Sequence, residues 1–332
     1  MLNIVFMGTP DFAQKSLQAV VEAGHHISGV VTNPDKPQGR GMKLVASPVK
    51  QYALEKGIEP IYQPQKVKQN EEFLNQIKNL QPDVICVVAY GKILPKELLN
   101  IPKFGCINVH GSLLPKYRGA APIQWSILNG DNVTGVTTMY MDAEMDTGDM
   151  ILKQEVAIGE DETTGELWER LSIIGAKLLI KTLELIEQGK APREKQQEKE
   201  MSIAPMLQKE MAKIDWENQT VSQIHNLVRG LNPIMGAYTF CNHKKLKFWK
   251  VKKMTNQDLL EVFTDMREYD YKLEDIMPGT ILFADEKQGL YVKAKDGILQ
   301  VLELQAENAR KMKTEEFLRG NKLSVGSMFC DS

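Results

Sequence analysis

The sequence has few cysteines, and they are not arranged to bind a metal or to build a disulfide framework. The four cysteines in 332 residues lie far apart, with no Cys-x-x-Cys pair and no histidine at ligand spacing. Zinc sites and small disulfide-stapled folds both need such clusters. We therefore expect reduced thiols, no metal and a cytoplasmic protein.

Long apolar runs and an excess of one charge are also lacking. No stretch of about 18 apolar residues, the length that crosses a membrane, occurs. Residues 2–7 are apolar but lack the basic flank of a signal peptide. The formal net charge is -2, so nucleic acid could bind only to local basic patches. With no coiled coil evident either, we expect a monomer without a membrane partner.

The first turn lacks the glycines of a dinucleotide-binding fingerprint. Residues 2–8 have the pattern of a strand and residues 12–24 that of a helix, which is how a doubly wound sheet begins. A pyrophosphate site at this turn needs G-x-G-x-x-G, and only Gly8 is present. This absence argues against a nicotinamide-dependent oxidoreductase.

Apolar runs and amphipathic patterns alternate through the first half of the chain. This alternation predicts an α/β fold, a Rossmann-like domain with a mostly parallel sheet. Residues 83–89 are a near-continuous β-branched run, as expected of a strand buried on both faces. Further strands are predicted at residues 27–32, 136–141 and 151–158, and helices at residues 47–56, 66–80 and 163–188.

The composition changes after the last of these helices. Residues 191–205 are charged and poor in apolar side chains, which is typical of a linker. A helical pattern and about five short strand patterns with glycine turns follow, and they predict a small β-barrel of the OB kind. The expected organisation is a catalytic domain over residues 1–189, a linker over 190–207 and an OB-like domain over 208–332.

The candidate chemistry belongs to an amide, an imidazole and a carboxylate. Asn108 and His110 alternate with apolar residues at the end of a strand pattern, so they share a face at the sheet edge where open α/β sheets bind ligands. Asp146 follows the next strand pattern and can reach His110 if the two strands are neighbours. Such a trio can stabilise an oxyanion and accept a proton when an amine attacks a carbonyl. The alternative is a histidine that a nearby carboxylate satisfies for structural reasons alone.

Cys106 is the one candidate for a covalent nucleophile. It shares the face of Asn108 but lies earlier in the strand, so we expect a buried core thiol. An attacking amine supplies its own nucleophile, and the scheme needs none from the protein.

Two basic stretches could contact phosphates. Residues 33–43 contain two prolines, two glycines and three cations, and they form a loop longer than a plain connection needs. This stretch is either a solvated loop or a basic arm. Residues 243–253 contain six lysines and no acid, with apolar residues in alternation. The resulting cationic side of a strand is either a solvated face or a nucleic-acid patch, and its concentrated charge favours the patch.

These motifs closely resemble the formyltransferase family that takes its formyl group from 10-formyltetrahydrofolate. The resemblance covers essentially the whole chain. Its central segments are Asn108-Val-His110-Gly-Ser112-Leu-Leu-Pro115, Tyr117-Arg-Gly-Ala-Ala-Pro122 and residues 142–148. The branch of the family that acts on initiator methionyl-tRNA is indicated by Met7-Gly-Thr-Pro-Asp-Phe12, Lys36-Pro-Gln-Gly-Arg40-Gly and Ser47-Pro-Val-Lys50.

The resemblance implies roles for particular residues. Catalysis would belong to Asn108, His110 and Asp146. The tetrahydrofolate donor would be bound by Ser112, Leu113, Leu114, Pro115, Tyr90, Gly91, Ile93, Leu94, Tyr140 and Asp142. The tRNA would be bound by the loop of residues 33–49, with Lys36, Lys43 and Arg40 as its principal cation, and by the C-terminal domain through Lys244, Lys245 and Lys247.

The reaction that the resemblance implies is transfer of a formyl group to the free amino group of methionine on initiator methionyl-tRNA. The amine would attack the formyl donor directly, without a covalent enzyme intermediate. A relative that formylates a small amine, such as a nucleotide sugar or glycinamide ribonucleotide, needs neither the basic second domain nor the long loop. A non-catalytic RNA-binding protein would leave the trio unexplained.

Overall fold

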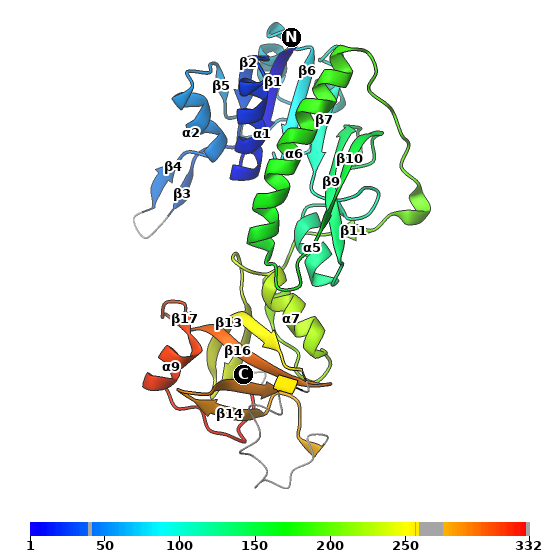
Figure 1. The fold of residues 1–332 in the computed structure, drawn as a ribbon. Helices are drawn as coiled ribbons and strands as arrows, with labels where there is room; N and C mark the ends of the chain where they lie inside the picture. Colours follow the sequence, from blue (N-terminus) through cyan, green and yellow to red (C-terminus); the bar gives the residue numbers. More distant parts are fainter. Residues whose placement is uncertain (39–41, 256, 259–274, 330–332) are drawn as a thin grey trace. The chain divides into compact units, whose positions relative to one another are not determined.

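The computed structural model describes residues 1–38, 42–255, 257–258 and 275–329 (Figure 1). The chain divides into two compact units. Unit 1 comprises Met1–Ile123, Val133–Ile158 and Glu166–Met206, and unit 2 comprises Gln124–Asn132, Gly159–Gly165 and Leu207–Ser332. No helix among the described residues is long and apolar enough to cross a membrane.

Unit 1 is built on a seven-stranded sheet with the order β10-β9-β7-β6-β1-β2-β5. Its strands are β1 (Asn3–Gly8), β2 (His26–Val31), β5 (Ile61–Tyr62), β6 (Val84–Val88), β7 (Cys106–His110), β9 (Val133–Tyr140) and β10 (Met150–Ala157). Strands β5, β2, β1, β6 and β7 run parallel, whereas β9 and β10 are antiparallel to their neighbours. The predicted mostly parallel sheet is therefore confirmed.

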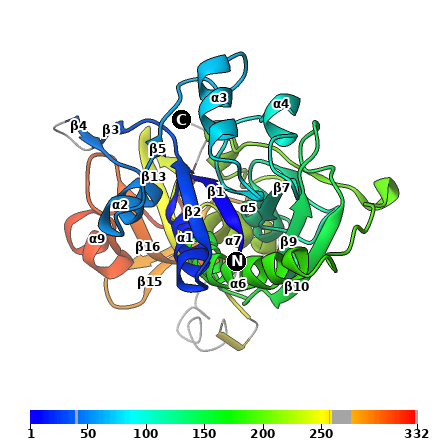
Figure 2. The same cartoon turned by 90° about the horizontal axis from the view of Figure 1, so that it is seen from above.

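Helices cover both faces of this sheet. In Figure 2, α1 (Asp11–Glu22) and α6 (Thr164–Glu187) lie on one face, and α3 (Glu71–Asn79) and α4 (Lys96–Leu99) lie on the other. On the first face, Phe12 of α1 meets Trp168 of α6 edge to face, with ring centroids 5.1 Å apart. Because the sheet is covered twice, the central strands are buried on both faces, and all five residues of β6 are buried.

The helix starts follow from their capping residues. Helix α2 (Pro48–Glu55) begins after Ser47, whose hydroxyl accepts the backbone N–H of Lys50 at 3.1 Å. Helix α3 is shorter than the predicted 66–80, because Asn70 caps it by accepting the N–H of Phe73.

The basic stretch after β2 contains regular structure. Strands β3 (Lys36–Gln38) and β4 (Lys43–Val45) pair antiparallel as a short hairpin, with Lys36 opposite Val45. The prediction of a wholly irregular loop was wrong. Each strand has only three residues and the first contains Pro37, so no strand pattern appears in the sequence. The proline is tolerated because both strands of a two-stranded hairpin are edge strands. Residues 39–41, including Arg40, lie outside the described residues.

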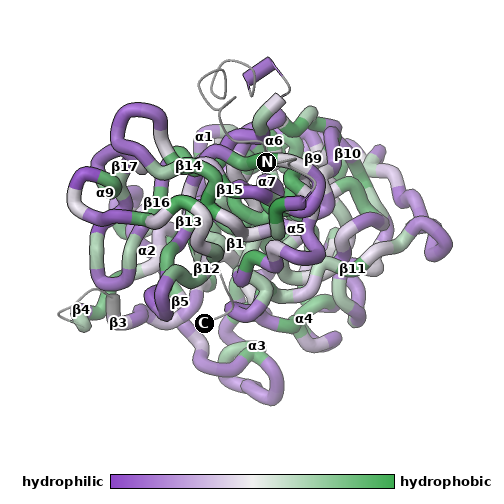
Figure 3. The backbone as a smooth tube through the Cα atoms, turned by 90° about the horizontal axis from the view of Figure 1, so that it is seen from below, coloured by the Kyte–Doolittle hydropathy of each residue, from purple (hydrophilic) through white to green (hydrophobic). Residues whose placement is uncertain are grey.

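The segment after α6 is attached to unit 1. Glu194 forms an isolated bridge with Met150, a short 3-10 turn spans Glu198–Glu200, and β11 (Ile203–Ala204) pairs parallel with β8 (Arg118–Gly119). Figure 3 colours the stretch leading to β11 mostly as hydrophilic. Its polar composition therefore does not keep it from packing on unit 1.

Unit 2 is an antiparallel sheet with helices packed against it. Helix α7 (Val221–Gly230) starts at a capping box formed by Thr220 and Gln223. The sheet has the order β12-β13-β16-β15-β14, with β17 beside β16. The elements are β12 (Ala237–Cys241), β13 (Lys244–Lys253), β14 (Ile281–Asp285), β15 (Gly289–Lys293), β16 (Ile298–Ala306), β17 (Met312–Lys313) and α9 (Thr314–Gly320). The five predicted strands are present in a small barrel-like domain, and β17 and α9 were not predicted.

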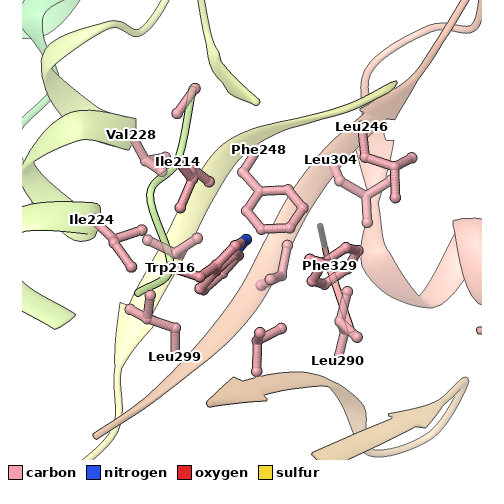
Figure 4. Packing of buried hydrophobic residues seen from close by; sticks show 14 of the residues in the cluster. Ile214, Trp216, Ile224, Val228, Leu246, Phe248, Leu290, Leu299, Leu304 and Phe329 are labelled. Atoms are coloured by element: carbon pink, nitrogen blue, oxygen red, sulfur yellow. The ribbon is translucent and has the colours of Figure 1, made fainter. Parts of the chain in front are cut away.

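Aliphatic side chains surround a group of aromatic rings in the core of unit 2 (Figure 4). The Trp216 and Phe329 rings stack with centroids 5.9 Å apart, and Phe248 meets Phe329 edge to face at 5.6 Å. The indole N–H of Trp216 donates to the Thr239 hydroxyl at 3.0 Å, so the one polar atom of this cluster is satisfied.

Candidate active site

The predicted trio converges at the end of β7. β7 pairs antiparallel with β9, so β9 ends beside the start of β7, and the loop that follows brings Asp146 to Asn108 and His110. The Asn108 Nδ2 atom lies 3.4 Å from Asp146 Oδ1, and His110 Nδ1 lies 3.6 Å from Asp146 Oδ2. The predicted proximity of Asp146 to His110 is thereby confirmed.

Backbone geometry brings the Asp146 carboxylate to this position. Asp146 has a φ of 55°, a left-handed conformation that aspartate tolerates better than most residues. Two residues later, a Cβ atom on Gly148 would lie 1.8 Å from the Tyr140 carbonyl oxygen, so only glycine fits. The backbone N–H of Gly119 donates to Asp146 Oδ2 at 2.9 Å.

The His110 ring has a defined orientation. Its Nε2 atom lies 2.9 Å from the Tyr117 carbonyl oxygen, which can only accept, so Nε2 carries a hydrogen. The nitrogen that faces the carboxylate is therefore Nδ1. The side chain is only 5% exposed, which excludes bulk water from most of the ring.

Sequence reasoning missed the residues that support Asp146. Gln196 donates to the carbonyl oxygens of Asp146 and Gly148, and its own oxygen accepts from the buried Arg118. Gln196 lies 50 residues after Asp146 in a polar stretch without periodicity. Gly119 and Tyr117 contribute backbone atoms only. No residue-type signal could have identified either contribution.

Cys106 is a core residue, as predicted. Its side chain is 2% exposed, and burial raises the pKa of its thiol to about 12. A thiol with such a pKa is protonated near neutral pH and does not act as a nucleophile. Cys86 and Cys241 are also buried, and Cys330 lies outside the described residues.

The residues predicted to bind the folate donor fall into two groups. In the turn after β7, Ser112 and Leu114 are buried with partners inside the protein. The Ser112 hydroxyl donates to the Lys116 carbonyl oxygen at 2.6 Å, and Leu114 packs with Met139 and Met150. Pro115 is buried too, and Leu113 is half-buried. Leu113 is therefore the most exposed of these four side chains, and the assignment of the group to folate binding stays a prediction.

The second group lies on the loops that follow β6 and β9. Tyr90 is buried and Leu94 packs in the same core cluster, whereas Ile93 is 73% exposed and Gly91 has a φ of 76°. Burial raises the pKa of Tyr90 to about 12. Since β6 and β7 are parallel neighbours, with Val87 opposite Asn108, this loop emerges beside the trio.

Tyr140 is the last residue of β9, and Asp142 lies on the loop that follows. The Arg193 guanidinium lies 3.7 Å from the centroid of the Tyr140 ring, and burial raises the pKa of this tyrosine. Asp142 is exposed, and its carboxylate accepts the N–H of Ala143.

The predicted tRNA-binding lysines that the structure describes lie on strands, and each of them is exposed or half-buried. Lys36 and Lys43 are exposed on the β3-β4 hairpin. On β13, Lys244 is exposed and the Lys245 ammonium lies 3.9 Å from the Tyr238 ring centroid. The Lys247 ammonium donates to the Met235 carbonyl oxygen at 2.8 Å, so part of its bonding capacity is used within unit 2.

Two family models cover most of the chain. One, described as "Formyl transferase", matches residues 2–183, and the other, "Formyl transferase, C-terminal domain", matches residues 206–322. The chain belongs to the formyl transferase family. Within the described residues, no group of three or more His, Cys, Asp or Glu side chains could hold a metal ion.

Formyl transferases similar to this chain along its whole length carry a more specific name. A protein named methionyl-tRNA formyltransferase from Clostridioides difficile (strain 630) is 50% identical over 98% of this chain and 99% of its own length. One of the same name from Ruminiclostridium cellulolyticum is 47% identical over 98% of each chain.

Solved structures with the same fold are more distant in sequence. An N-formyltransferase from Helicobacter canadensis, in complex with folinic acid and dTDP-3-aminofucose, has a TM-score of 0.65 at 19% identity and covers 92% of this chain and all 100% of its own. HypX from Aquifex aeolicus, in complex with tetrahydrofolic acid, has a TM-score of 0.62 at 16% identity over 98% of this chain and 50% of its own. At such identities these structures show a shared formyl transferase fold.

Proposed function

We propose that this chain transfers the formyl group of 10-formyltetrahydrofolate to the free amino group of methionine on initiator methionyl-tRNA. The product is N-formylmethionyl-tRNA for translation initiation. The observation that carries the proposal is the meeting of Asn108, His110 and Asp146 within 3.6 Å at the end of β7. Full-length relatives named methionyl-tRNA formyltransferase, 45–50% identical to this chain, support the choice of acceptor.

The trio suits direct attack by an amine on a formyl carbon. Attack places negative charge on the formyl oxygen and positive charge on the amine nitrogen. The Asn108 amide supplies one hydrogen-bond donor for the oxygen. Since Nε2–H of His110 is donated to the Tyr117 carbonyl oxygen, this residue supplies its donor from Nδ1, with both ring nitrogens carrying a hydrogen. Asp146 holds the imidazole and accepts the proton that leaves the amine, directly or through a water. The protein forms no covalent bond to the substrate in this scheme.

The loops beside the trio have the chemistry to hold a folate donor. The Tyr90 hydroxyl is buried and has no hydrogen-bond partner among the described residues, so a polar group of a ligand could satisfy it. Ile93 and Met145 are exposed apolar side chains, 73% and 59% accessible, on the loops after β6 and β9. Exposed apolar groups at a sheet edge are typical of a site for an aromatic ring.

The basic hairpin and the lysines of β13 are proposed to bind the tRNA. Lys36 and Lys43 are exposed on the hairpin, and Arg40, which we propose as the principal cation, lies outside the described residues. On β13, Lys244 is exposed, and Lys245 and Lys247 lie next to aromatic rings, a combination that suits phosphates and bases. We propose that the aromatic side chains next to these lysines contribute by stacking on bases.

The division of labour that we propose follows the domain prediction, with residues 1–189 catalytic and residues 208–332 holding the tRNA. We further propose that the enzyme acts in the cytoplasm as a monomer, which sedimentation velocity at micromolar concentration would test. A stable dimer in that measurement would contradict the monomer.

The experiment that tests the function compares three acceptors with 10-formyltetrahydrofolate as donor: methionyl initiator tRNA, free methionine and a nucleotide-linked amino sugar. We expect formylation of the charged tRNA alone. Formylation of the amino sugar instead would keep the chemistry and overturn the tRNA assignment.

The roles of the trio are tested with His110→Ala and Asp146→Ala. Loss of an oxyanion donor or of a proton acceptor is expected to lower kcat about 100- to 10,000-fold, with tRNA affinity unchanged. His26→Ala is the matched control, since His26 is exposed at the start of β2. Full activity in both trio variants would contradict the mechanism.

A further inference from the structure

The loop that carries Asp146 is held by a side chain from outside its own strand pair. Gln196 lies on the segment between the two family domains, and its Nε2 atom donates to the Asp146 carbonyl oxygen at 2.7 Å and to the Gly148 carbonyl oxygen at 2.9 Å. We infer that Gln196 is a positioning residue, which fixes the catalytic loop so that the Asp146 carboxylate meets His110. This inference rests on the proposed function.

The orientation of the Gln196 amide is determined by its third partner. Arg118 Nε donates to Gln196 Oε1 at 2.9 Å, and a guanidinium has no acceptor. The amide oxygen must therefore face Arg118, and the NH2 group must face the loop. Both hydrogens of the NH2 group then have a carbonyl partner, so every polar atom of this side chain is used.

Arg118 is itself fixed. It is 5% exposed and pairs with Glu198 through two nitrogens, with Nη2 to Oε1 at 2.8 Å and Nη1 to Oε2 at 3.2 Å. A bidentate pair of this kind restricts both position and rotation of the guanidinium. Gln196 and Glu198, two residues apart on the same segment, thus both accept hydrogen bonds from Arg118.

The same place in the fold also holds the Asp146 carboxylate. Gly119, the residue after Arg118, donates its backbone N–H to Asp146 Oδ2 at 2.9 Å, and β8 pairs with β11 of the segment. The backbone of Asp146 and its carboxylate are therefore held by one connected set of contacts. The polar atoms of Gln196 bond to other residues of the protein, so Gln196 is a positioning residue and not a catalytic one.

The loop needs such support because of its backbone conformation. Asp146 has a φ of 55°, a left-handed conformation that a residue other than glycine keeps only where the surrounding structure imposes it. Without the two Gln196 hydrogen bonds, the loop is free to relax away from this conformation. A displacement of about 1 Å in a catalytic group can cost about 100-fold in rate.

Gln196→Glu is the informative substitution. It keeps the shape of the side chain and an oxygen for Arg118, but it replaces the two donated hydrogens with an acceptor that faces two carbonyl oxygens. We expect kcat to fall about 10- to 100-fold, with KM for the folate donor and for the tRNA little changed. The matched control is Gln197→Glu, the same change at the next residue, which is exposed.

A double-mutant cycle separates positioning from general structural damage. If Gln196 acts through Asp146, then Gln196→Glu costs little further rate in an Asp146→Asn enzyme, measured in single turnovers. Should the two losses multiply instead, Gln196 does not act through Asp146 and the inference is overturned. Gln196→Met, which removes the hydrogens without adding charge, tests the same point if the Glu variant does not fold.

The outcomes also distinguish this inference from the proposed function. An unmodified enzyme that fails to formylate methionyl initiator tRNA overturns the function, whatever the variants do. An active enzyme in which Gln196→Glu, Gln196→Met and Gln197→Glu all keep the original kcat overturns the inference alone.

Discussion

The backbone around residue 148 leaves no room for a side chain, and this is why the residue is a glycine. A Cβ atom at this position would overlap with the Tyr140 carbonyl oxygen. This oxygen belongs to the backbone and cannot rotate away as a side chain could. The loop between Tyr140 and Gly148 must therefore open to admit any side chain, and Asp146 lies within that loop.

We expect Gly148→Ala to lower both stability and activity. Overpacking of this kind costs about 1–3 kcal/mol, and the moved carboxylate should lower kcat as well. Thermal unfolding and initial rates measure the two effects. Gly320→Ala is the control, because a Cβ at Gly320 would meet no atom within 4 Å. Equal Tm and kcat in the two alanine variants would contradict the steric argument.

The residues of the site differ in how far sequence alone predicts them. Asn108 and His110 are predictable, because alternation along one strand is a local pattern. Asp146 is predictable only given the pairing of two strands. The Gly119 N–H and the Tyr117 carbonyl are atoms that every such residue has, and Gln196 comes from a stretch whose polarity is typical of a linker. Contacts of this kind follow from the folded chain and leave no local signature.

The β3-β4 hairpin depends on a polar network at its base. The Lys50 ammonium donates to the Asp35 carboxylate at 2.7 Å and to Gln63 Oε1 at 2.8 Å, and Gln63 Nε2 donates back to Asp35. Lys50 is on α2, whereas Asp35 precedes β3 by one residue. The network therefore ties the hairpin base to a helix.

We expect Lys50→Met to weaken the reaction with tRNA more than the binding of folate. The methionine side chain keeps the apolar stem but loses both hydrogen bonds, so the arm should sample more orientations. The kcat/KM for tRNA and the Kd for the folate donor measure the difference. Lys56→Met is the control, since the Lys56 ammonium pairs with its exposed neighbour Glu55 and lies over the Tyr52 ring of the same helix. A Lys50→Met enzyme with unchanged tRNA kinetics would show that the network does not support the arm.

The same network predicts a pH dependence. The hydrogen bond from Lys50 lowers the pKa of the Asp35 carboxyl below its ordinary value. A carboxyl whose pKa is lower in the folded protein adds stability above its unfolded pKa, and this contribution is lost as the pH falls through the folded pKa. The hairpin base should therefore hold at neutral pH and loosen only below about pH 4.

Elements were easier to predict than their ends and edges. The strands predicted in unit 2 and helix α7 have clear sequence patterns. Helix α7 begins at Val221, β12 at Ala237 and β16 at Ile298, which are the predicted first residues. The two-residue β17 and the α9 helix after it have too few residues for a period to appear. The hairpin strands are three residues each and were missed for the same reason.

The whole chain is nearly neutral, yet its lysines are concentrated on particular strands. With a formal net charge of -2, the protein as a whole does not attract RNA. Binding therefore has to come from local clusters of positive charge such as the lysines of β13. Each phosphate contact of this kind releases counterions.

We expect kcat/KM for tRNA to fall steeply with salt, and the slope to depend on these lysines. Lys244→Ala and Lys245→Ala together should reduce the log-log slope by up to about one per lysine that contacts a phosphate. Lys287→Ala, in the exposed turn between β14 and β15, is the control. An unchanged slope in the double variant would place the tRNA elsewhere on the protein.

Gln196 and Glu198 lie in residues 184–205, between the stretches that the two family descriptions match. An exchange of C-terminal domains between relatives at residue 190 would give the Asp146 loop a partner segment of foreign origin. An exchange after Met206 would keep loop and segment from the same parent. Recombination in the course of evolution meets the same constraint, so this polar segment should be inherited together with the domain that precedes it.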